Sequence, residues 1–552
     1  MVKCTASVFL FLVVSQSLFA QINLPQTATI TTGQVSAQIS TSGALIDNFL
    51  VPSAAGDSSV SLLREVSLWM GGEVAGNILL AVQRKDSVSD EFVSGYRGLD
   101  QSKGIWKVTQ QQVQDHLNDF QDNGHIDNPI PAIYAWPGMH NPHSLNYNGF
   151  AVDTFDRYIT APFQDVNADN IYDPDDGDFP FGTGVGVFHQ ASEMLFAPFH
   201  VNMKGAPMEK FPLDGSTLLF AYDCDDANFL EAAIFCRVSY IYNYPYPLDT
   251  FYLGCYIDGN IGGSQDDYMG SIHEGSKVYF YNGDNFDEGG FGPASPLLAF
   301  DPYLLQVGGQ EGSVSANSVM TIHPGIETPL MGTDEPTQDI EYYRYMDGKW
   351  RDGTSLTYGG TGKGGSQPTS FIYPGNPANS DEWSEVSAQN PPGDRRAMLS
   401  YKQNSLLPKA RNRLLFSLIY VPPNPIAEQI KTMNDYSLAH FEFNFVDYFP
   451  PEASPLDSIT CFPISKTTDL VSHPARLFPN PAHGELNIQT ETMELATLSF
   501  FNVLGTLERF DAHPDQSNGT VKMNVSGLPP GLHLFQCVWK DGYRKTWKVL
   551  IE

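Results

Sequence analysis

Short runs in which apolar and polar residues alternate recur along most of the chain, and they constrain the fold more than any other feature. They occur at residues 59–72 (SVSLLREVSLWMGG), 216–224 (STLLFAYDC), 232–244 (AAIFCRVSYIYNY), 250–259 (TFYLGCYIDG), 277–282 (KVYFYN) and 413–421 (RLLFSLIYV). A period of two places successive side chains on opposite faces of a strand, so these runs predict sheets with one buried face. The 48 glycines and 39 prolines, with 12% aromatic and only 17% charged residues, are typical of strands and turns. We therefore expect a mainly β fold.

Two segments break this pattern and predict helices. In residues 109–120 (TQQQVQDHLNDF), Val113, Leu117 and Phe120 share one face behind Thr109, which is suited to the N-cap. Residues 427–441 (AEQIKTMNDYSLAHF) have the second helical pattern. The expected fold is thus a large multi-sheet N-terminal region with a few short helices, followed by a small C-terminal antiparallel β-sandwich.

The first twenty residues predict a secretory signal peptide. A lone cation, Lys3, precedes the short apolar run FLFLVV and the small residues that lead to Ala20, after which we expect cleavage. The apolar run is too short to cross a bilayer, and no later segment approaches the roughly 20 apolar residues of a transmembrane helix. The chain is therefore expected to pass through the periplasm and to be secreted or held at the outer cell surface.

The 552 residues divide into segments of different character. Residues 21–455 form the mainly β exported region, with one or two subdomains. A polar, proline-containing linker follows at 456–473, and residues 474–552 resume short alternating strands.

Three spaced motifs in this last segment carry a family resemblance. FPNPA at 478–482, FFNVLG at 500–505 and VSGLPPGLHLF at 525–535 resemble the type A sorting domain of type IX secretion cargo. His533 stands where the family pattern has Tyr. The resemblance implies that the type IX secretion machinery is a partner, that the chain crosses the outer membrane, and that this domain is usually removed, often with attachment to surface lipopolysaccharide.

The N-terminal region also resembles uncharacterised exported proteins of that group. The shared blocks are SLWMGG at 67–72, LDTFYLGCYIDGNIGGSQDDYMG at 248–270, YNGDNFDE at 281–288 and PPGDRRAML at 391–399, together with the loop at 165–176. This resemblance implies secretion and a common β-fold, and it supplies no catalytic residue.

The formal net charge of −32, from 63 acidic and 31 basic residues, argues against a nucleic-acid partner, because phosphate binding relies on clustered Lys and Arg. A calcium ligand, or simple dispersal in solution, fits this charge better.

The sequence DVNADNIYDPDDGD at 165–178 predicts a calcium loop. Its expected ligands are Asp165, Asn167, Asp169, Asp173 and Asp176 at positions one, three, five, nine and twelve, with the carbonyl of Ile171. Oxygens on alternate residues of a tight loop converge on one point, and calcium takes six to eight of them. Asn170 occupies the position usually held by Gly, and Asn tolerates the left-handed conformation required there. The competing interpretation is an acidic turn without metal.

Other acids and histidines are interpreted more simply. Two further acidic stretches are treated as turns rather than cation sites: Asp258, Asp266 and Asp267, then Asp284, Asp287 and Glu288. His125, His140 and His143 lie close in sequence, and zinc binds where three ligands converge, but their spacing matches no standard motif. Loop histidines without metal are the favoured interpretation.

Five cysteines remain after the signal peptide. Cys224 and Cys236 are placed to link neighbouring strands, whereas Cys255 and Cys537 are expected to be buried thiols.

Neither a GxSxG elbow nor an HExxH motif is present, so the sequence identifies no catalytic residue. The predicted function is a calcium-stabilised secreted or cell-surface protein with a binding, adhesive or structural role, and a glycan or surface ligand is one class of partner. Four tryptophans could stack on sugar rings, although core packing is the commoner use. They are Trp69, Trp136, Trp350 and Trp383. The alternative is a secreted, glycosidase-like hydrolase whose carboxylates come from distant segments.

Overall fold

The computed structural model describes most of residues 21–445 and the strands of residues 475–551. The described ranges are 21–41, 44–52, 59–85, 91–152, 155–182, 190–205, 208–224, 227–284, 286–307, 310–312, 316–324, 332–445, 475–479, 482–490, 495–502, 507–512, 520–528, 531–539 and 544–551. The predicted signal peptide and the predicted linker at 456–473 lie outside them. Strands account for 42% of the described residues and helices for 15%, so the mainly β prediction is confirmed.

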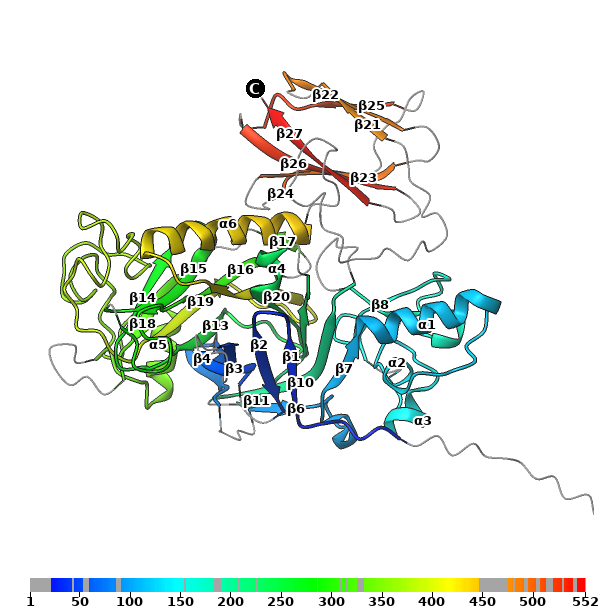
Figure 1. Ribbon diagram of the computed structural model, residues 1–552, viewed down its shortest axis with the longest axis horizontal. Coiled ribbons are helices and arrows are strands. Elements are labelled where there is room, and N and C mark those ends of the chain that lie inside the picture. Colours follow the sequence, from blue (N-terminus) through cyan, green and yellow to red (C-terminus); the bar gives the residue numbers. More distant parts are fainter. Residues whose placement is uncertain are drawn as a thin grey trace, which may run out of the picture.

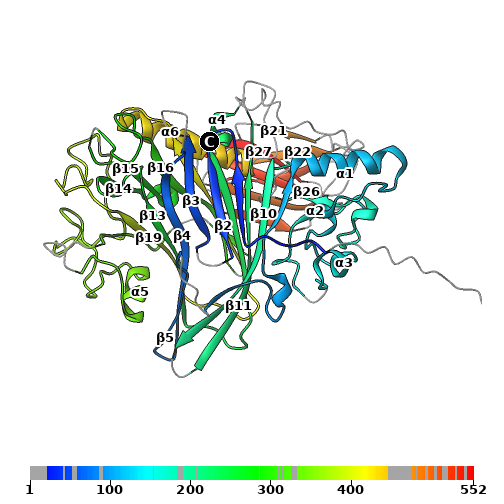
Figure 2. The same ribbon diagram turned by 60° about the horizontal axis from the view of Figure 1, so that its bottom comes forward.

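Two antiparallel sheets form the N-terminal region (Figures 1 and 2). The first, sheet A, runs in the order β1 (Thr27–Thr31), β2 (Ser36–Ser40), β3 (Ile46–Pro52), β4 (Ser59–Val74), β13 (Thr250–Gly259), β19 (Arg396–Gln403) and β18 (Ser318–Ile322). Beyond Ile46, the first residue of β3, β5 (Asn77–Val82) pairs with the second half of β4.

The second, sheet B, runs in the order β7 (Trp106–Thr109), β10 (Glu193–Gly205), β11 (Met208–Ala221), β12 (Ala233–Tyr242), β20 (Arg411–Val421), β16 (Leu297–Val307), β15 (Lys277–Asn282) and β14 (Asp267–Ile272). The short strands β6 (Phe92–Ser94) and β17 (Gln310–Gly312) pair with β10 and β16. A single pairing, Lys204 with Leu80, joins the two sheets.

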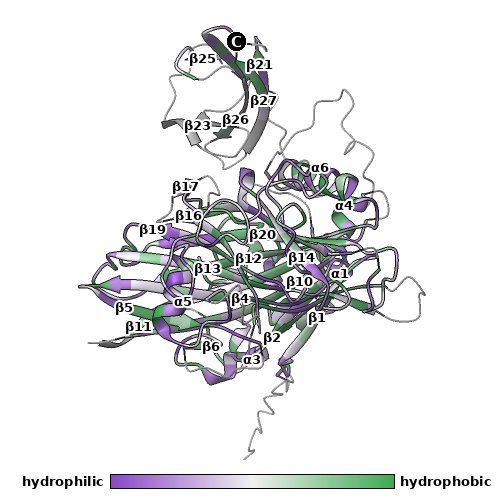
Figure 3. Cartoon of the chain, turned by 90° about the vertical axis from the view of Figure 1, so that its left-hand side faces the viewer, coloured by the Kyte–Doolittle hydropathy of each residue, from purple (hydrophilic) through white to green (hydrophobic). Residues whose placement is uncertain are grey.

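Side chains alternate between the two faces along each strand, so the two faces of sheet B pack against different cores. On β11, Leu219 and Ala221 belong to the core shared with sheet A, whereas Leu218 and Phe220 belong to a second core on the opposite face. The six strand runs predicted from the sequence all lie in these sheets. Figure 3 shows the strands through the middle of the region coloured largely as apolar.

Helices and loops cover the outer face of sheet B. Helices α1 (Gln110–Asn123), α2 (Pro131–Tyr134), α3 (Ser144–Asn148) and α4 (Asn228–Glu231) contribute to the second core. Helix α6 (Ile426–Phe445) packs its Met433 against β15, β16 and β20, and α5 (Asp339–Met346) packs against sheet A (Figure 1).

The structure confirms both predicted helices, α1 and α6. At the start of α1, the Thr109 side chain accepts the Gln112 N–H, and the Gln112 side chain accepts the Thr109 N–H. This capping box satisfies two backbone donors that the helix itself cannot.

The predicted pairing of Cys224 with Cys236 is wrong. Cys236 is a buried free thiol, whereas Cys224 is disulfide-bonded elsewhere. The physical reason is the alternation across sheet B, because Cys236 faces the core between the sheets and Cys224 lies in the core on the other face. Cys255 and Cys537 are buried, as predicted.

The C-terminal segment forms the predicted β-sandwich. One sheet contains β21 (Ala475–Phe478), β22 (Glu485–Thr490) and β25 (Thr520–Asn524), and the other contains β24 (Leu507–Ala512), β23 (Leu495–Asn502), β26 (Gly531–Trp539) and β27 (Arg544–Ile551). Both sheets bury apolar residues in one core, including Ile488 from the first and Phe535 from the second. No helix in the described part of the chain is long and apolar enough to span a membrane.

Candidate metal site

The predicted calcium loop is closed at its base by a short ladder. Strands β8 (Phe163–Gln164) and β9 (Phe179–Pro180) pair on either side of it, and a 3-10 turn, η2 (Pro174–Asp176), lies near its end. The Asp178 carboxylate holds both ends, since it accepts the Val166 N–H at 2.7 Å and the Asp173 N–H at 3.0 Å. Burial raises the pKa of Asp178 to about 6, against the opposing effect of these two hydrogen bonds.

Tyr172 anchors the loop to the helices beside it. Its ring is fully buried and its hydroxyl donates to the Ile133 carbonyl at 2.7 Å. A Cβ at position 138 would lie 2.6 Å from the Tyr172 side chain, so Gly138 is required for this close approach. From α1, His116 contacts the carbonyl of Asp178 at 3.0 Å. The loop is therefore positioned by buried contacts at its base, while its tip is exposed.

Hydrogen bonds link four of the predicted calcium ligands at this tip. The Asn167 Nδ2 donates to Asp169 Oδ2 and to Asp176 Oδ2, each at 3.1 Å. The Asp165 carboxylate accepts the N–H groups of Asp169 at 3.2 Å and Asn170 at 2.8 Å. Partial burial raises the pKa of Asp176, and the neighbouring acids Asp173, Asp169 and Asp175 add to the rise. The loop thus gathers side-chain oxygens whose charges repel one another.

The backbone of the loop agrees with the calcium-loop pattern. Asn170 has a φ of 65°, the left-handed conformation expected at the position of the usual Gly. Asp169 Oδ1 accepts the Ile171 N–H at 2.8 Å, which continues the tight turn. The metal-binding role of the Ile171 carbonyl stays a prediction.

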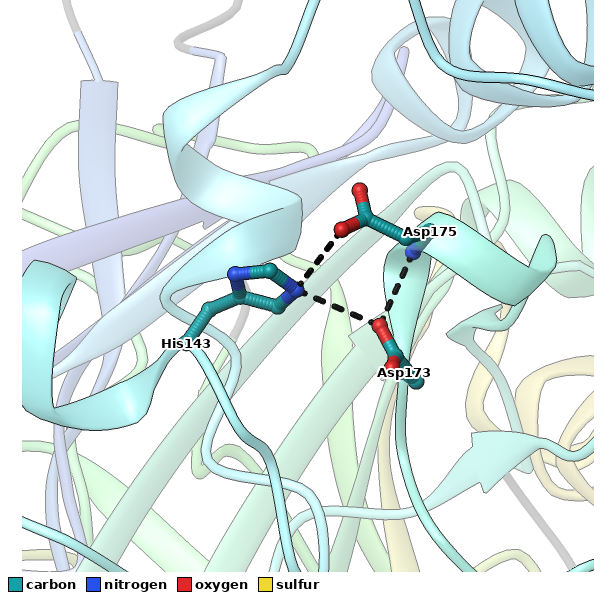
Figure 4. Close-up of side chains that lie close together, drawn as sticks. All are labelled: His143, Asp173 and Asp175. Atoms are coloured by element: carbon teal, nitrogen blue, oxygen red, sulfur yellow. Dashed lines mark hydrogen bonds and ion pairs between the residues drawn. The ribbon is translucent and has the colours of Figure 1, made fainter.

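Asp173, the predicted calcium ligand at position nine, contacts His143. His143 Nε2 lies 3.2 Å from Asp173 Oδ1 and 3.2 Å from Asp175 Oδ2 (Figure 4). The hydrogen bond with Asp173 is the main cause that raises the pKa of His143, and the same bond lowers the pKa of Asp173. The metal-binding role of Asp173 in the calcium loop also stays a prediction.

Sequence reasoning did not identify this histidine–aspartate cluster. Among the described residues, the group that places a histidine nitrogen and two carboxylate oxygens within 4.8 Å of one another contains His143, and neither His125 nor His140. Thirty residues separate His143 from Asp173, so no motif spacing connects them. The one available sequence signal for this cluster was that the turn with His143 and the acidic loop at 165–178 lie on either side of the same segment of the chain.

The two other acidic stretches meet in space. The Asp287 carboxylate accepts the N–H groups of Gly263 at 2.9 Å, Gly289 at 3.0 Å and Phe291 at 2.7 Å, and Asp267 accepts the Ile261 N–H at 3.1 Å. These bonds support the predicted interpretation of both carboxylates as parts of turns. Burial raises the pKa of Asp266 to about 6, with Asp287 and Glu288 as further causes.

Asp258 is separate from these turns. It lies 3.4 Å from the Nε of Arg396, which also bonds Glu335. Burial raises the pKa of Asp258 to about 7 despite the attraction of Arg396.

The tryptophans considered for sugar stacking are core residues. Trp69, Trp136 and Trp350 are fully buried and Trp383 is 6% exposed, so core packing, the commoner use, is confirmed. Arg84 lies over the ring of Trp69 at 5.5 Å, which closes that face to a ligand.

Comparison with known families identifies the C-terminal sandwich. Residues 476–552 match the family described as the secretion system C-terminal sorting domain. The chain is a type IX secretion cargo protein. Its sorting domain directs export to the cell surface or into the medium and is recognised by the type IX secretion machinery. No curated protein matches the cargo sequence.

Solved structures resemble the cargo protein only distantly. A polysaccharide lyase is 7% identical with a TM-score of 0.28, and the alignment covers 95% of this chain and 47% of the lyase. An amine oxidase of Aspergillus nidulans is 8% identical (TM-score 0.26, coverage 76% and 58%), and a lysyl oxidase of Pichia pastoris is 9% identical (TM-score 0.23, coverage 76% and 56%). The chain spans about half the length of these proteins, and similarities of this size assign no activity.

Proposed function

We propose that the mature cargo protein is a cell-surface or released protein whose N-terminal region is stabilised by one calcium ion, and that its role is binding or structural. The observation that carries this proposal is that Asn167 donates to Asp169 and Asp176 at the loop tip, where the Asp169 N–H is shared by Asp165 and Asn167. Two of these carboxylates lie 3.1 Å from one amide nitrogen, so they are close to each other.

The donor set fits calcium better than other metals. Calcium takes six to eight oxygens, and three carboxylates with one amide oxygen supply hard ligands of the required kind. The Ile171 carbonyl and water would complete the shell, and position nine commonly acts through water, which agrees with the turn of Asp173 towards His143. Neutralising the converging acids would lock a loop that otherwise repels itself.

Thermal unfolding of the mature chain tests the proposal. Extracellular calcium sites have dissociation constants of roughly 10⁻⁴–10⁻³ M, so 10 mM calcium should stabilise the fold by about 1.4–2.7 kcal/mol. We expect the melting temperature to rise by a few degrees over that in a chelator. The Asp169→Asn variant should lose this rise, whereas Asp115→Asn, on the exposed side of α1, should keep it. Equal melting temperatures of the wild type in calcium and in chelator would contradict the proposal.

One observation favours the alternative, a secreted hydrolase. A groove of about 370 Å³ at the start of α1 contains two carboxylates, Glu193 and Asp223, and no aromatic residue among its described lining. These carboxylates accept the N–H groups of Thr31 at 3.0 Å and Gly33 at 2.9 Å. If the protein is a glycosidase, the wild type should release reducing sugar from a panel of polysaccharides and Glu193→Gln should not. An inactive wild type on that panel would remove this alternative.

A further inference from the structure

His143 faces two carboxylates at once, those of Asp173 and Asp175. One nitrogen, His143 Nε2, faces two carboxylate oxygens at the same distance, 3.2 Å (Figure 4). The hydrogen bond between His143 and Asp173 is at the long end of the usual range, and longer than the about 2.7–2.9 Å of most charge-assisted hydrogen bonds. All three ligand atoms lie within 4.8 Å of one another, as the ligands of a single metal ion do.

The two nitrogen–oxygen distances are close to the separation of neighbouring ligands around a small tetrahedral ion. Zinc binds nitrogen and carboxylate oxygen at about 2.0–2.2 Å, which places neighbouring tetrahedral ligands about 3.3 Å apart. We propose that His143, Asp173 and Asp175 bind a divalent transition-metal ion of the zinc type. This site adjoins the calcium loop and uses as a ligand Asp173, the residue at the predicted position nine of that loop.

The ligand set separates this ion from calcium. Imidazole is a ligand that zinc and similar metals prefer, whereas calcium favours a shell made only of oxygen. Side-chain exposures of 21% for His143, 25% for Asp173 and 57% for Asp175 leave a path from solvent, and water can occupy the remaining coordination position.

Neighbouring side chains hold the three ligands in place. The buried Asn141 accepts the His143 backbone N–H at 2.8 Å and donates to the Tyr134 carbonyl at 2.9 Å. The hydroxyl of Tyr134 in turn donates to Asp175. Asp173 Oδ1 also accepts the Asp175 N–H at 3.0 Å. Such partners behind the ligands fix their orientation in metal sites.

The two proposed sites meet at Asp173 and the turn η2, and they use different side chains of η2. Asp175 points to His143, whereas the next residue, Asp176, contacts Asn167 in the calcium loop. Each site therefore has its own variants: His143→Ala for the zinc-type site and Asp169→Asn for the calcium loop.

The test measures zinc binding to the mature chain in saturating calcium, by competition with a chromophoric chelator. We expect one zinc ion per wild-type chain, with the affinity reduced about 100-fold or more in His143→Ala. His140→Ala removes a histidine of the same segment that lies outside the cluster, and it should bind zinc as the wild type does. Asp169→Asn should also keep zinc binding while losing the calcium-dependent rise in melting temperature.

Cobalt provides a second readout that does not depend on affinity. Bound to the wild type, it should give the intense visible absorption of a tetrahedral site, and His143→Ala should lack it. If His143→Ala does not fold, Asp175→Asn, which alters the most exposed ligand, replaces it in both measurements. Zinc binding that is absent from the wild type, or unchanged in a folded variant, would overturn the proposal, whatever the calcium experiment shows.

Discussion

The protein stabilises carboxylate charge differently in two regions. One is the tip of the 165–178 loop, and the other is the pair of turns that meet at Asp287. At the loop tip, the carboxylates of Asp169 and Asp176 share a single amide donor and are largely exposed. At the turns, Asp287 is 1% exposed and accepts three backbone N–H groups. The comparison teaches that a run of acids in the sequence does not fix the exposure of its carboxylates, because the fold buries Asp287 and leaves Asp169 and Asp176 at the surface.

Removing the Asp287 carboxylate should have the largest effect. In Asp287→Ala, the N–H groups of Gly263, Gly289 and Phe291 lose their acceptor, and each unsatisfied buried donor costs about 1–3 kcal/mol. We expect the free energy of unfolding to fall by about 3–5 kcal/mol in urea titrations, equally in calcium and in chelator. A loss below about 1 kcal/mol, or a loss that depends on calcium, would contradict the difference between the loop tip and the turns.

Asp258 is a buried acid whose carboxylate accepts no backbone N–H group of the described residues. Its titration should appear in the pH dependence of the free energy of unfolding. Its pKa is raised to about 7 by burial, so the folded state holds the proton more tightly than the unfolded state. Its contribution is fully present below about pH 4 and is lost as pH rises to about 7, a change of about 2–4 kcal/mol.

Asp258→Asn should remove this part of the pH dependence. The measurement compares the free energy of unfolding of the two proteins from pH 4 to pH 8, with Asp115→Asn as an exposed control. The difference between wild type and variant should shift by about 2–4 kcal/mol in favour of the variant. Parallel curves would show that Asp258 is ionised in the folded protein at all these values.

The smallest effect is expected at Asp176, and its sign should reverse with calcium. Partial burial, and then the neighbouring acids, raise the pKa of this largely exposed group, so in chelator Asp176→Asn should stabilise the fold by no more than about 0.5 kcal/mol. In calcium the same variant should be less stable than the wild type, because it lacks one ligand. Differential scanning calorimetry in the two buffers measures both values, and a destabilisation of equal size in both would contradict the assigned role.

Much of the fold followed from local patterns in the sequence. The strands could be predicted because each has its own two-residue period, and α1 because Thr109 and Gln112 form a cap within four residues. The left-handed conformation of Asn170 followed from its position in the loop pattern. All of these features depend on residues that are close in sequence.

The features that could not be predicted depend on packing between distant segments. His143 reaches Asp173 because Tyr172 is buried beneath α2 and over Gly138, which no sequence period encodes. Asp287 reaches Gly263 because pairing of β14 with β15 brings two turns together. The wrong pairing of Cys224 with Cys236 has the same origin, since only the folded sheet decides which face each thiol occupies.

The most direct test of the account is a crystal structure of the mature chain grown with calcium, with anomalous diffraction to identify the ion. The account predicts a calcium peak at the tip of the 165–178 loop, bound by Asp165, Asn167, Asp169 and Asp176 at about 2.3–2.6 Å. A loop without a peak, in which the Asn167 amide still donates to Asp169 and Asp176, would contradict it.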